Sequence, residues 1–314
     1  MSELTLGKYG EVLLGGSEMW DNTKLKAYGC EMRGKLGYEE HLIPIEPREA
    51  LVFGGAMHKA VEVWTRERME GKQDVDAVST AERAFVEIWE KDLPQERREM
   101  LELGGDRRSV QNFRRLFGGY RKKFPLEGFD RVVSVETPVT ALLGEVDGEP
   151  VYWTAVLDRV VEQWGGVYYR EVKTSSFPLD DSWFYGFRRS GQLHGQVWLG
   201  QNTLGTKFTG AVVEGIQVQA PLKTKVRAAD ELVQCEVIPF TQENLEEWRE
   251  NVLLKVRRIR QARAEGRYVM DNGDLCGAFR DGCEYRKVCN AMPDARGALK
   301  EQHFTRRVWN PLAK

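Results

Sequence analysis

Asp158, Glu171 and Lys173 place two carboxylates and one ammonium close together in the middle of the chain. Two carboxylates can form a hard oxygen site for Mg²⁺ or Mn²⁺. Such a metal holds a phosphate oxygen and lowers the pKa of its bound water. A lysine beside it can orient that water or stabilise developing negative charge. The alternative interpretation is a cluster of charges on a solvated sheet face, and the residue types alone leave both open.

A predicted β-hairpin brings these side chains together. The stretch LDRVVEQWGGVYYREVKTSS predicts strands at 151–163 and 167–174, joined at its Gly-Gly pair, because both glycines tolerate the positive φ of a tight turn. With those two glycines as the loop, Asp158 is expected opposite Lys173 and diagonal to Glu171. The three charged groups would then converge on one face of the sheet.

Cysteines near the end of the chain predict a metal centre. Cys276, Cys283 and Cys289 lie close in sequence, and Cys30 can complete a set of four if the chain folds back. Four thiolates suit either a zinc ion or an iron–sulfur cluster, and the spacing does not separate these. Buried free thiols are the alternative. Cys235 falls within an alternating strand pattern, and we expect it in the core.

Helices and further strands must position these groups. Apolar spacing predicts a helix at 54–70 that carries His58 and a helix at 182–199 that carries Gln192. A lone histidine on a helix is more often packed or solvated than a ligand. The remaining expected elements are helices at 75–92, 95–123 and 241–265 and strands at 131–143, 209–219 and 231–239. The helix at 95–123 is rich in Arg and Lys; its cations form either a solvated face or a phosphate path, with Arg114, Arg115 and Lys122 as candidates.

The totals of the chain fit one globular domain. Apolar residues make up 41% of the 314 residues, charged residues 30%, and the net charge is −2. Contact with nucleic acid would therefore need locally gathered positive charge. We see no signal-peptide pattern and no apolar run near the ~18 residues of a membrane helix, so we expect a cytoplasmic protein without a membrane partner. We divide residues 1–314 into a helical arm (54–124), a catalytic sheet core (125–240) and a C-terminal helix with a cluster-binding segment (241–290), to which Cys30 belongs.

The order of these features resembles a known family. Cys30, His58, Asp158, Glu171-X-Lys173, Gln192 and the three C-terminal cysteines follow the pattern of the iron–sulfur, RecB-like branch of the PD-(D/E)XK nucleases, over about residues 20–290. That branch includes CRISPR-associated and phage nucleases and the nuclease domain of AddB. Three features differ from its pattern: Gln196 stands at the usual tyrosine, Ala155 stands at a frequent glycine, and the first C-terminal cysteine gap is longer.

The resemblance implies a fold and a set of roles. The fold is an α/β restriction-endonuclease-like core, a central mixed sheet flanked by helices, with a helical insertion and a cluster that joins the termini. The implied ligands of Mn²⁺ or Mg²⁺ are His58, Asp158, Glu171 and the Val172 carbonyl. Lys173 would align the attacking water, and Gln192 would position DNA or Lys173. The implied ligands of a [4Fe-4S] cluster are Cys30, Cys276, Cys283 and Cys289.

The expected function is metal-dependent hydrolysis of DNA, by an exonuclease acting on single-stranded ends in recombination, repair, phage replication or CRISPR adaptation. DNA is the expected partner, with recombination or CRISPR proteins as further candidates, and Arg280, Arg286 and Lys287 would contact phosphates. Two alternatives are a catalytically silent DNA-binding recombination partner and a zinc or cluster redox protein. The intact Asp158, Glu171 and Lys173 argue against the first, and the lack of a CxxC pair or a nucleotide-binding glycine motif argues against the second. The sequence does not give the oligomeric state.

Overall fold

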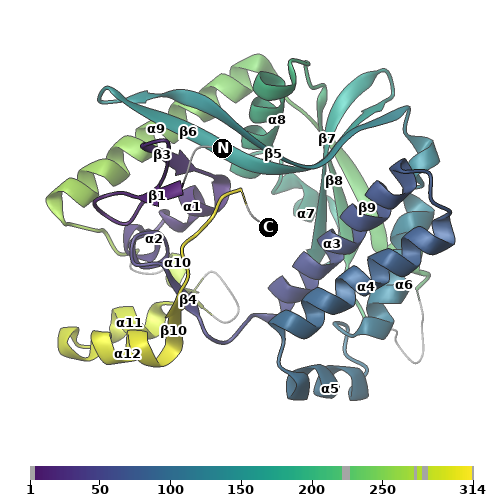
Figure 1. Cartoon of the computed structure of the whole chain (residues 1–314), viewed down its shortest axis with the longest axis horizontal. Coiled ribbons are helices and arrows are strands. Elements are labelled where there is room, and N and C mark those ends of the chain that lie inside the picture. Colours follow the sequence, from purple (N-terminus) through teal and green to yellow (C-terminus); the bar gives the residue numbers. More distant parts are fainter. Residues whose placement is uncertain (1–3, 221–226, 272–273, 278–281, 313–314) are drawn as a thin grey trace.

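The computed structural model describes residues 4–220, 227–271, 274–277 and 282–312. A central mixed sheet is flanked by helices, and two lobes project from it on either side of a central space (Figure 1). One lobe is the helical arm, and the other combines the N-terminal and C-terminal segments. The mixed α/β sheet expected from the sequence is therefore confirmed. Arg280 lies outside the described residues.

The sheet has eight strands in the order β1-β2-β3-β6-β7-β8-β9, with β5 paired to the other edge of β6. The pairs β5–β6, β6–β7 and β8–β9 are antiparallel, whereas β7–β8 and β3–β6 are parallel. The strands are β1 Leu4–Leu6, β2 Val12–Leu14, β3 Ser17–Trp20, β5 Arg131–Val146, β6 Glu149–Gln163, β7 Gly166–Ser175, β8 Gly210–Gln217 and β9 Val233–Pro239.

Strand β6 is long enough to hold two partners along one edge. Near its start Trp153 pairs with β3, and from Arg159 onward it pairs with β7. Strand β5 runs along the opposite edge of β6 throughout. Strands β3 and β7 therefore pair with different stretches of the same edge of β6, and among the described residues no strand pairs with Thr154–Leu157 on that side.

The helical arm covers one face of the sheet. Its helices are α3 Glu49–Met69, α4 Asp74–Asp92, α5 Gln95–Leu103 and α6 Val110–Lys123. Stacked aromatic rings fill the space between them, with ring centroids of Phe85 and Phe113 3.7 Å apart. The same core reaches Val172 of β7 and Ile216 of β8, so burial of apolar area fixes the arm against the sheet.

Two further helices pack on the other face. They are α8 Gly191–Leu204 and α9 Gln242–Glu265, preceded by the short α7 Asp181–Tyr185. Thr241 caps α9 in a capping box with Asn244. Trp153 of β6 lies edge-on to Trp248 of α9, with ring centroids 5.1 Å apart. This contact joins α9 to the strand that carries Asp158.

The second lobe is built from both ends of the chain. Its helices are α1 Asn22–Ala27, α2 Glu31–Tyr38, α10 Asp274–Gly277, α11 Arg286–Asn290 and α12 Arg296–His303, and its strands are β4 Leu42–Pro44 and β10 Phe304–Arg306. Strand β10 pairs antiparallel with β4, and Tyr285 donates a hydrogen bond to the Leu42 carbonyl at 2.7 Å. The short 3₁₀ helices are η1 Leu126–Gly128, η2 Ala229–Leu232 and η3 Pro293–Ala295.

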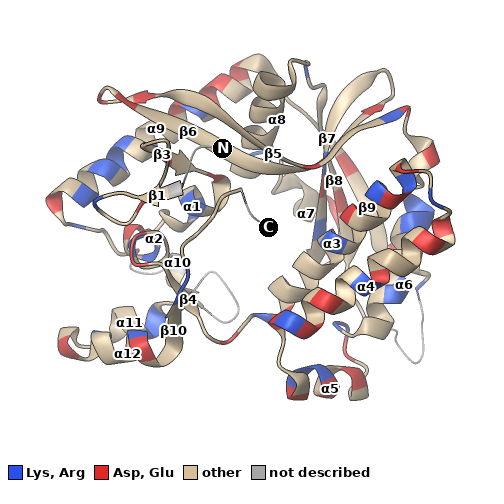
Figure 2. Cartoon of the chain, in the orientation of Figure 1, with Lys and Arg blue, Asp and Glu red and all other residues tan. Residues whose placement is uncertain are grey.

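A buried ion network ties this lobe to α9. Glu18 lies 2.8 Å from the Lys24 ammonium and 2.8 Å from the Arg263 guanidinium. Burial alone would raise the pKa of Glu18, but the two cations outweigh it and hold that pKa at about 2. Charged residues otherwise intermix along the arm helices and α9 (Figure 2), in keeping with the small net charge. None of the helices in the described ranges combines the length and apolar character that a membrane crossing requires.

Three expectations about elements are wrong. The helix expected at 95–123 is two helices, because Gly105 at φ +59° lies in the turn between α5 and α6. The helix expected at 182–199 breaks between Gly186 and Ser190, so α8 begins at Gly191. Cys235 is exposed, because β9 is an edge strand and the arm does not cover that position.

Candidate active site

The β6–β7 hairpin turns one residue earlier than the sequence predicts. Trp164 and Gly165 occupy the loop with φ of +53° and +74°, both positive as a tight hairpin turn requires. Gly166 begins β7 instead, where an added Cβ would lie 2.3 Å from the Thr209 hydroxyl. Gln163 pairs with Gly166 and Arg159 with Arg170, where the pairing ends. The same register continued by one residue would place Asp158 opposite Glu171, not opposite Lys173.

Three potential metal ligands converge at this point. The Nδ1 atom of His58 on α3 lies 3.3 Å from Asp158 Oδ2. Ligand atoms of His58, Asp158 and Glu171 all lie within 4.8 Å of one another. Glu171 is buried and Asp158 nearly so. Two carboxylate oxygens and one imidazole nitrogen are a donor set that Mg²⁺ or Mn²⁺ accepts, with the nitrogen favouring Mn²⁺.

A small cavity adjoins these ligands. It measures about 10 Å³, and His58, Asp158 and Val172 are among the residues that line it. Space of this size holds about one water molecule. Glu136 of β5 also lines it and has a φ of +46°, a strained conformation for a residue other than glycine. The sequence did not point to Glu136, because nothing in its neighbourhood marks that conformation.

Lys173 and Gln192 connect to the same carboxylate. The Lys173 ammonium lies 2.5 Å from Glu171 Oε1 and donates to the Gln192 side-chain oxygen at 3.1 Å. The Gln192 amide nitrogen donates to Glu171 Oε1 at 2.9 Å. Gln192 of α8 therefore bridges Glu171 and Lys173, the two candidate site residues of β7. The expected proximity of Gln192 to Lys173 agrees with this geometry.

Tyr169 is a further site residue that sequence reasoning missed. Its hydroxyl donates to Glu171 Oε2. Burial, together with the charges of Asp158 and Glu171, raises the pKa of Tyr169 well above its ordinary value, so it stays a neutral donor. With its amide nitrogen toward Glu171, Gln196 lies 3.0 Å from the same hydroxyl. The sequence did carry a signal for Tyr169, because it lies two residues before Glu171 and therefore on the same face of the strand.

The four expected cluster cysteines line a second cavity. It measures about 220 Å³, and its walls include Cys30, Cys276, Cys283 and Cys289. Cys30 lies at the start of α2, and the Asp271 amide approaches its sulfur at 3.5 Å. Burial raises the pKa of Cys289, and the neighbouring cysteines add to the rise. Residues far apart in sequence thus meet around one space.

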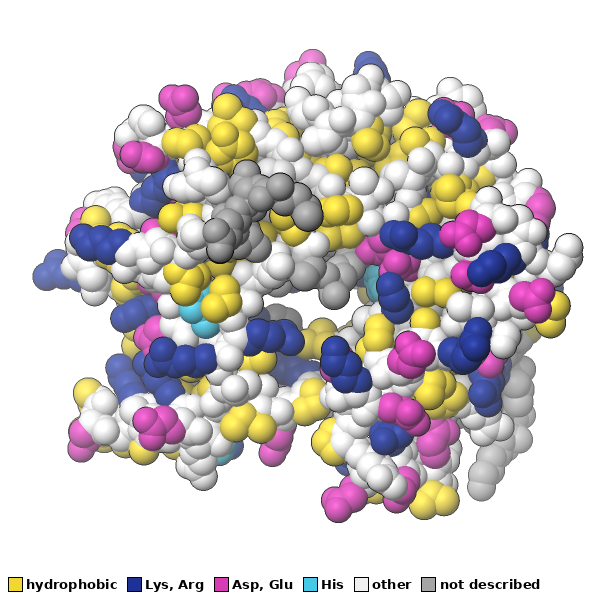
Figure 3. All heavy atoms as spheres, viewed as in Figure 1, with side chains coloured by type: hydrophobic (Ala, Val, Ile, Leu, Met, Phe, Trp, Pro, Cys, Tyr) yellow, Lys and Arg dark blue, Asp and Glu magenta, His cyan; other side chains and the backbone are white. Residues whose placement is uncertain are grey.

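The basic residues of the arm do not gather at the site. Arg114 pairs with Glu82, Lys122 pairs with Asp230, and Arg115 donates to the Gln219 carbonyl at 2.6 Å. Arg286 and Lys287, in contrast, line a cleft of about 1040 Å³ between the two lobes. Arg107 and Arg108 of the α5–α6 turn line its other side. Figure 3 shows the surface hollowed between the lobes, with Lys and Arg on both walls.

Comparison with known families decides how the site is to be interpreted. The family model of the PD-(D/E)XK nuclease superfamily matches residues 23–290. This chain belongs to the PD-(D/E)XK nuclease superfamily. Asp158, Glu171 and Lys173 all lie inside the matched range, and PD-(D/E)XK nucleases use divalent metal ions. The chain is therefore a nuclease, and its sheet and flanking helices form a restriction-endonuclease-like core.

Two solved structures are similar to this PD-(D/E)XK protein. A crystal structure described as "Putative exonuclease" from Eubacterium rectale has 15% identity, covers 83% of this chain and 86% of its own, and gives a TM-score of 0.44. A crystal structure of SSO0001 has 12% identity, covers 74% of this chain and 84% of its own, and gives a TM-score of 0.27. At these scores neither likeness bears on the activity. No curated protein matches the chain.

Proposed function

We propose that this nuclease is a Mg²⁺- or Mn²⁺-dependent deoxyribonuclease that degrades single-stranded DNA from its ends. The convergence of His58, Asp158 and Glu171 within 4.8 Å is the observation that carries the proposal. With the Val172 carbonyl, these residues would hold the ion. When bound, the ion supplies a positive charge for a phosphate oxygen and lowers the pKa of a coordinated water.

The other site residues act on the water and the phosphate. The Lys173 ammonium lies 2.5 Å from Glu171 Oε1, and 29% of the Lys173 side chain is exposed. From there it aligns the attacking water and stabilises the charge that develops on the phosphate. Gln192 holds the Lys173 ammonium in place through their 3.1 Å hydrogen bond. Tyr169 fixes Glu171 from its other oxygen and keeps the carboxylate oriented.

The cleft between the lobes supports a single-stranded substrate. Its cations include Arg107, Arg108, Arg286 and Lys287, which would follow a phosphate backbone. Phe177, just after β7, lines the same cleft and is 74% exposed. An exposed aromatic ring in a basic groove offers a stacking surface to an unpaired base. Those features, together with the resemblance to RecB-like nucleases, favour single-stranded DNA ends as the substrate. Such ends arise in recombination, repair, phage replication or CRISPR adaptation.

We assign the four-cysteine cavity to a structural [4Fe-4S] cluster. Cys30, Cys276, Cys283 and Cys289 all line this one cavity of about 220 Å³. Four thiolates around one space are a ligand set that suits a [4Fe-4S] cluster. Such a cluster would join α2 to the segment 276–289.

A nuclease assay tests the proposal. We expect purified protein to shorten single-stranded DNA labelled at either end when Mn²⁺ or Mg²⁺ is present, and to leave it intact in EDTA. A matched duplex with blunt ends should be cut more slowly. Asp158→Asn protein prepared in parallel controls for contaminating nucleases. Metal-independent cleavage, or equal cleavage by the variant, would remove the proposed site from the reaction.

A further inference from the structure

A further cavity adjoins the metal site, with Asp158 in its lining, and the open edge of β6 forms one of its walls. Between the β3 and β7 pairings, no strand of the described chain pairs with Thr154–Leu157 on that side. In an antiparallel pair, every second residue directs its N–H and C=O away from its partner strand. Because β5 occupies the opposite edge of β6, those main-chain groups face the cavity. They offer hydrogen bonds to whatever enters.

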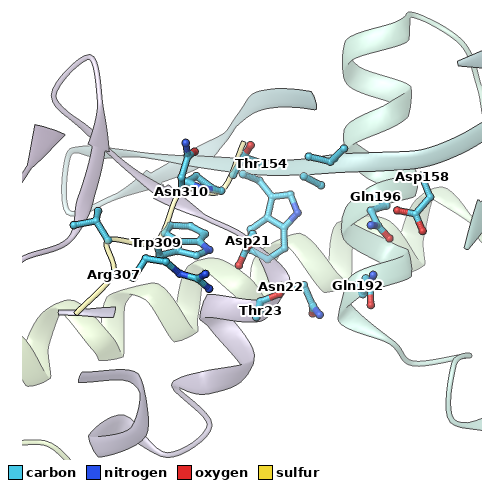
Figure 4. A pocket seen from close by; sticks show the side chains of 15 residues that line it. Asp21, Asn22, Thr23, Thr154, Asp158, Gln192, Gln196, Arg307, Trp309 and Asn310 are labelled. Carbon is cyan, nitrogen blue, oxygen red and sulfur yellow. The ribbon is translucent and has the colours of Figure 1, made fainter. Parts of the chain in front are cut away.

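The cavity measures about 500 Å³ and lies directly beside Asp158. Figure 4 shows Asp158, Gln192 and Gln196 at one end and Arg307, Trp309 and Asn310 of the C-terminal segment at the other. Buried Trp153 and the partly exposed Trp309 supply aromatic surface. This volume lies within the ~300–1,000 Å³ typical of small-molecule sites.

The C-terminal segment is fixed in position as the outer wall. Its Arg307 amide donates to the His41 carbonyl at 3.0 Å, next to the β4–β10 pairing. The Trp309 ring lies edge-on to Tyr38, with centroids 5.4 Å apart, and the Lys24 ammonium lies 5.4 Å from its centre. The indole is therefore held against the second lobe before any ligand arrives, which lowers the entropy cost of binding.

We propose that this cavity binds the base and sugar of the nucleotide next to the scissile phosphate. The inference rests on the proposed function, because the phosphate must lie at Asp158 and Lys173 for the adjoining base to reach the cavity. The base stacks against Trp309, and its polar edge meets the open main chain of β6 and the Asn310 side chain. Arg307, at the rim, meets the following phosphate.

Purely apolar or purely charged ligands fit this lining less well. The walls alternate aromatic rings with amide, hydroxyl and carboxylate groups, among them Asn22, Thr23 and Asp21. A nucleoside presents the same combination, a flat ring with hydrogen-bonding groups at its edge and a polar sugar. The cavity lies beside Asp158, which is where the nucleotide next to the scissile phosphate would lie.

The test compares base recognition with and without Trp309. Single-stranded oligonucleotides carry either a normal or an abasic nucleotide at the 5′ or the 3′ end. We expect wild-type protein to show a KM about tenfold lower for the normal nucleotide at one end, the size that about 1.4 kcal/mol gives, within the range of base–aromatic stacking. Trp309→Ala should remove that preference, and Trp309→Phe should keep most of it.

Trp164→Ala is the matched control, because Trp164 lies in the hairpin turn, is 60% exposed and does not line the cavity. It should retain the wild-type preference. If Trp309→Ala fails to fold, Asn310→Ala and Arg307→Ala take its place. An unchanged preference in soluble Trp309 and Asn310 variants would overturn the proposal.

A binding experiment separates this proposal from the nuclease assignment. Deoxyadenosine monophosphate is titrated into wild-type protein and Trp309→Ala in EDTA, and calorimetry reports the affinity. Binding that weakens about tenfold in Trp309→Ala supports the cavity even if no DNA is cleaved. Cleavage of DNA without any effect of Trp309 on binding or on KM would leave the nuclease standing and exclude the base site.

Discussion

Glu171 receives three polar contacts and lies near two further candidate ligands, and these neighbours define the chemistry at the scale of single residues. Lys173 and Gln192 meet its Oε1, Tyr169 meets its Oε2, and His58 and Asp158 lie within ligand distance. A buried carboxylate keeps its charge only when such partners compensate for lost hydration. A single substitution can remove the polar group of each of these neighbours and leave the apolar core unchanged. The roles of the neighbours can therefore be separated experimentally.

Asp158→Asn, Glu171→Gln and Lys173→Ala should each lower kcat by at least ~10²-fold, because each removes a metal ligand or the charge that stabilises the transition state. The amide variants keep the size of the side chain. Steady-state cleavage of single-stranded DNA, with circular dichroism to confirm the fold, measures the effect. Glu162→Gln is the control, an exposed carboxylate of the same hairpin that pairs with Arg131. Near wild-type cleavage by any of the three would remove that residue from the site.

His58→Ala should raise the Mn²⁺ concentration needed for half-maximal activity, while affinity for DNA in Ca²⁺ changes little. The reason is that the imidazole contributes one ligand of the proposed site and none of the cleft. Excess Mn²⁺ should restore part of the activity. Lys59→Ala, one residue further along α3 and paired with Glu62, serves as the control. Equal loss at every Mn²⁺ concentration would indicate that His58 has a structural role instead.

At the scale of elements, the distance between α3 and β7 determines whether the candidate metal ligands can meet. His58 comes from α3, and Glu171 and Lys173 come from β7, so their meeting depends on how closely the two elements pack. Gly54 lies at that contact, where an added Cβ would be 3.0 Å from the Thr174 hydroxyl. A glycine there permits an approach that a larger residue would prevent.

Gly54→Leu should therefore lower activity by tenfold or more, because it pushes α3 away from β7 and separates His58 from Asp158. Gly55→Leu is a matched control, since an added Cβ at the exposed Gly55 meets nothing within 4 Å. That control should raise the free energy of unfolding by up to about 1 kcal/mol, because leucine favours a helix over glycine. Urea unfolding and cleavage rates report both quantities. Identical activities of the two variants would contradict the argument.

Elements also show how far the sequence could predict this molecule. The strands, the capping of α9 by Thr241 and the order of the site residues are local signals and were predictable. The register of the hairpin was not predictable. Trp164 adopts the left-handed conformation in the turn, and Gly166 lies in β7, where a side chain would clash with Thr209. Both reasons lie in tertiary structure. Glu136 was missed for the same cause, since its place in the cavity lining depends on neighbours that only the fold supplies. Tyr169 differs, because its position two residues before Glu171 was a signal in the sequence.

For the whole molecule, the buried ion network joins Glu18 and Lys24 to Arg263 of α9, and the proposed cluster would join Cys30 to the C-terminal cysteines. Purified protein should be brown and contain iron and acid-labile sulfide. Replacing Cys30, Cys276, Cys283 or Cys289 by serine should remove the colour and lower the melting temperature, because the cluster joins distant segments. Cys235→Ser, at an exposed position far from the cavity lining, should change neither property. Colourless protein with one stoichiometric Zn²⁺ after anaerobic preparation would overturn the cluster but not the nuclease site.

Stability should depend on pH through Glu18. Its folded-state pKa of about 2 lies below its ordinary value of 4.5, so its contribution is complete above pH 4.5 and is lost as the pH falls toward 2. The difference in unfolding free energy between wild-type protein and Glu18→Gln should shrink by roughly 3 kcal/mol over that window. Urea unfolding of both proteins at several pH values measures it. A difference that stays constant with pH would show that Lys24 and Arg263 do not act on Glu18 as described.

The second lobe also determines when the molecule can mature during synthesis. In several contacts of this lobe one partner is synthesised long before the other. Strand β3 pairs with β6, β4 pairs with β10, and the Leu42 carbonyl accepts a hydrogen bond from the Tyr285 hydroxyl. A ribosome that has released the arm and sheet has therefore made the candidate metal ligands but not the cavity wall that carries Trp309. On the proposals above, the nascent chain would pass through a stage that has the metal ligands and lacks the base site. Contacts between residues far apart in sequence form late and slowly. Chaperones and proteases therefore act on the chain mainly before the second lobe is complete.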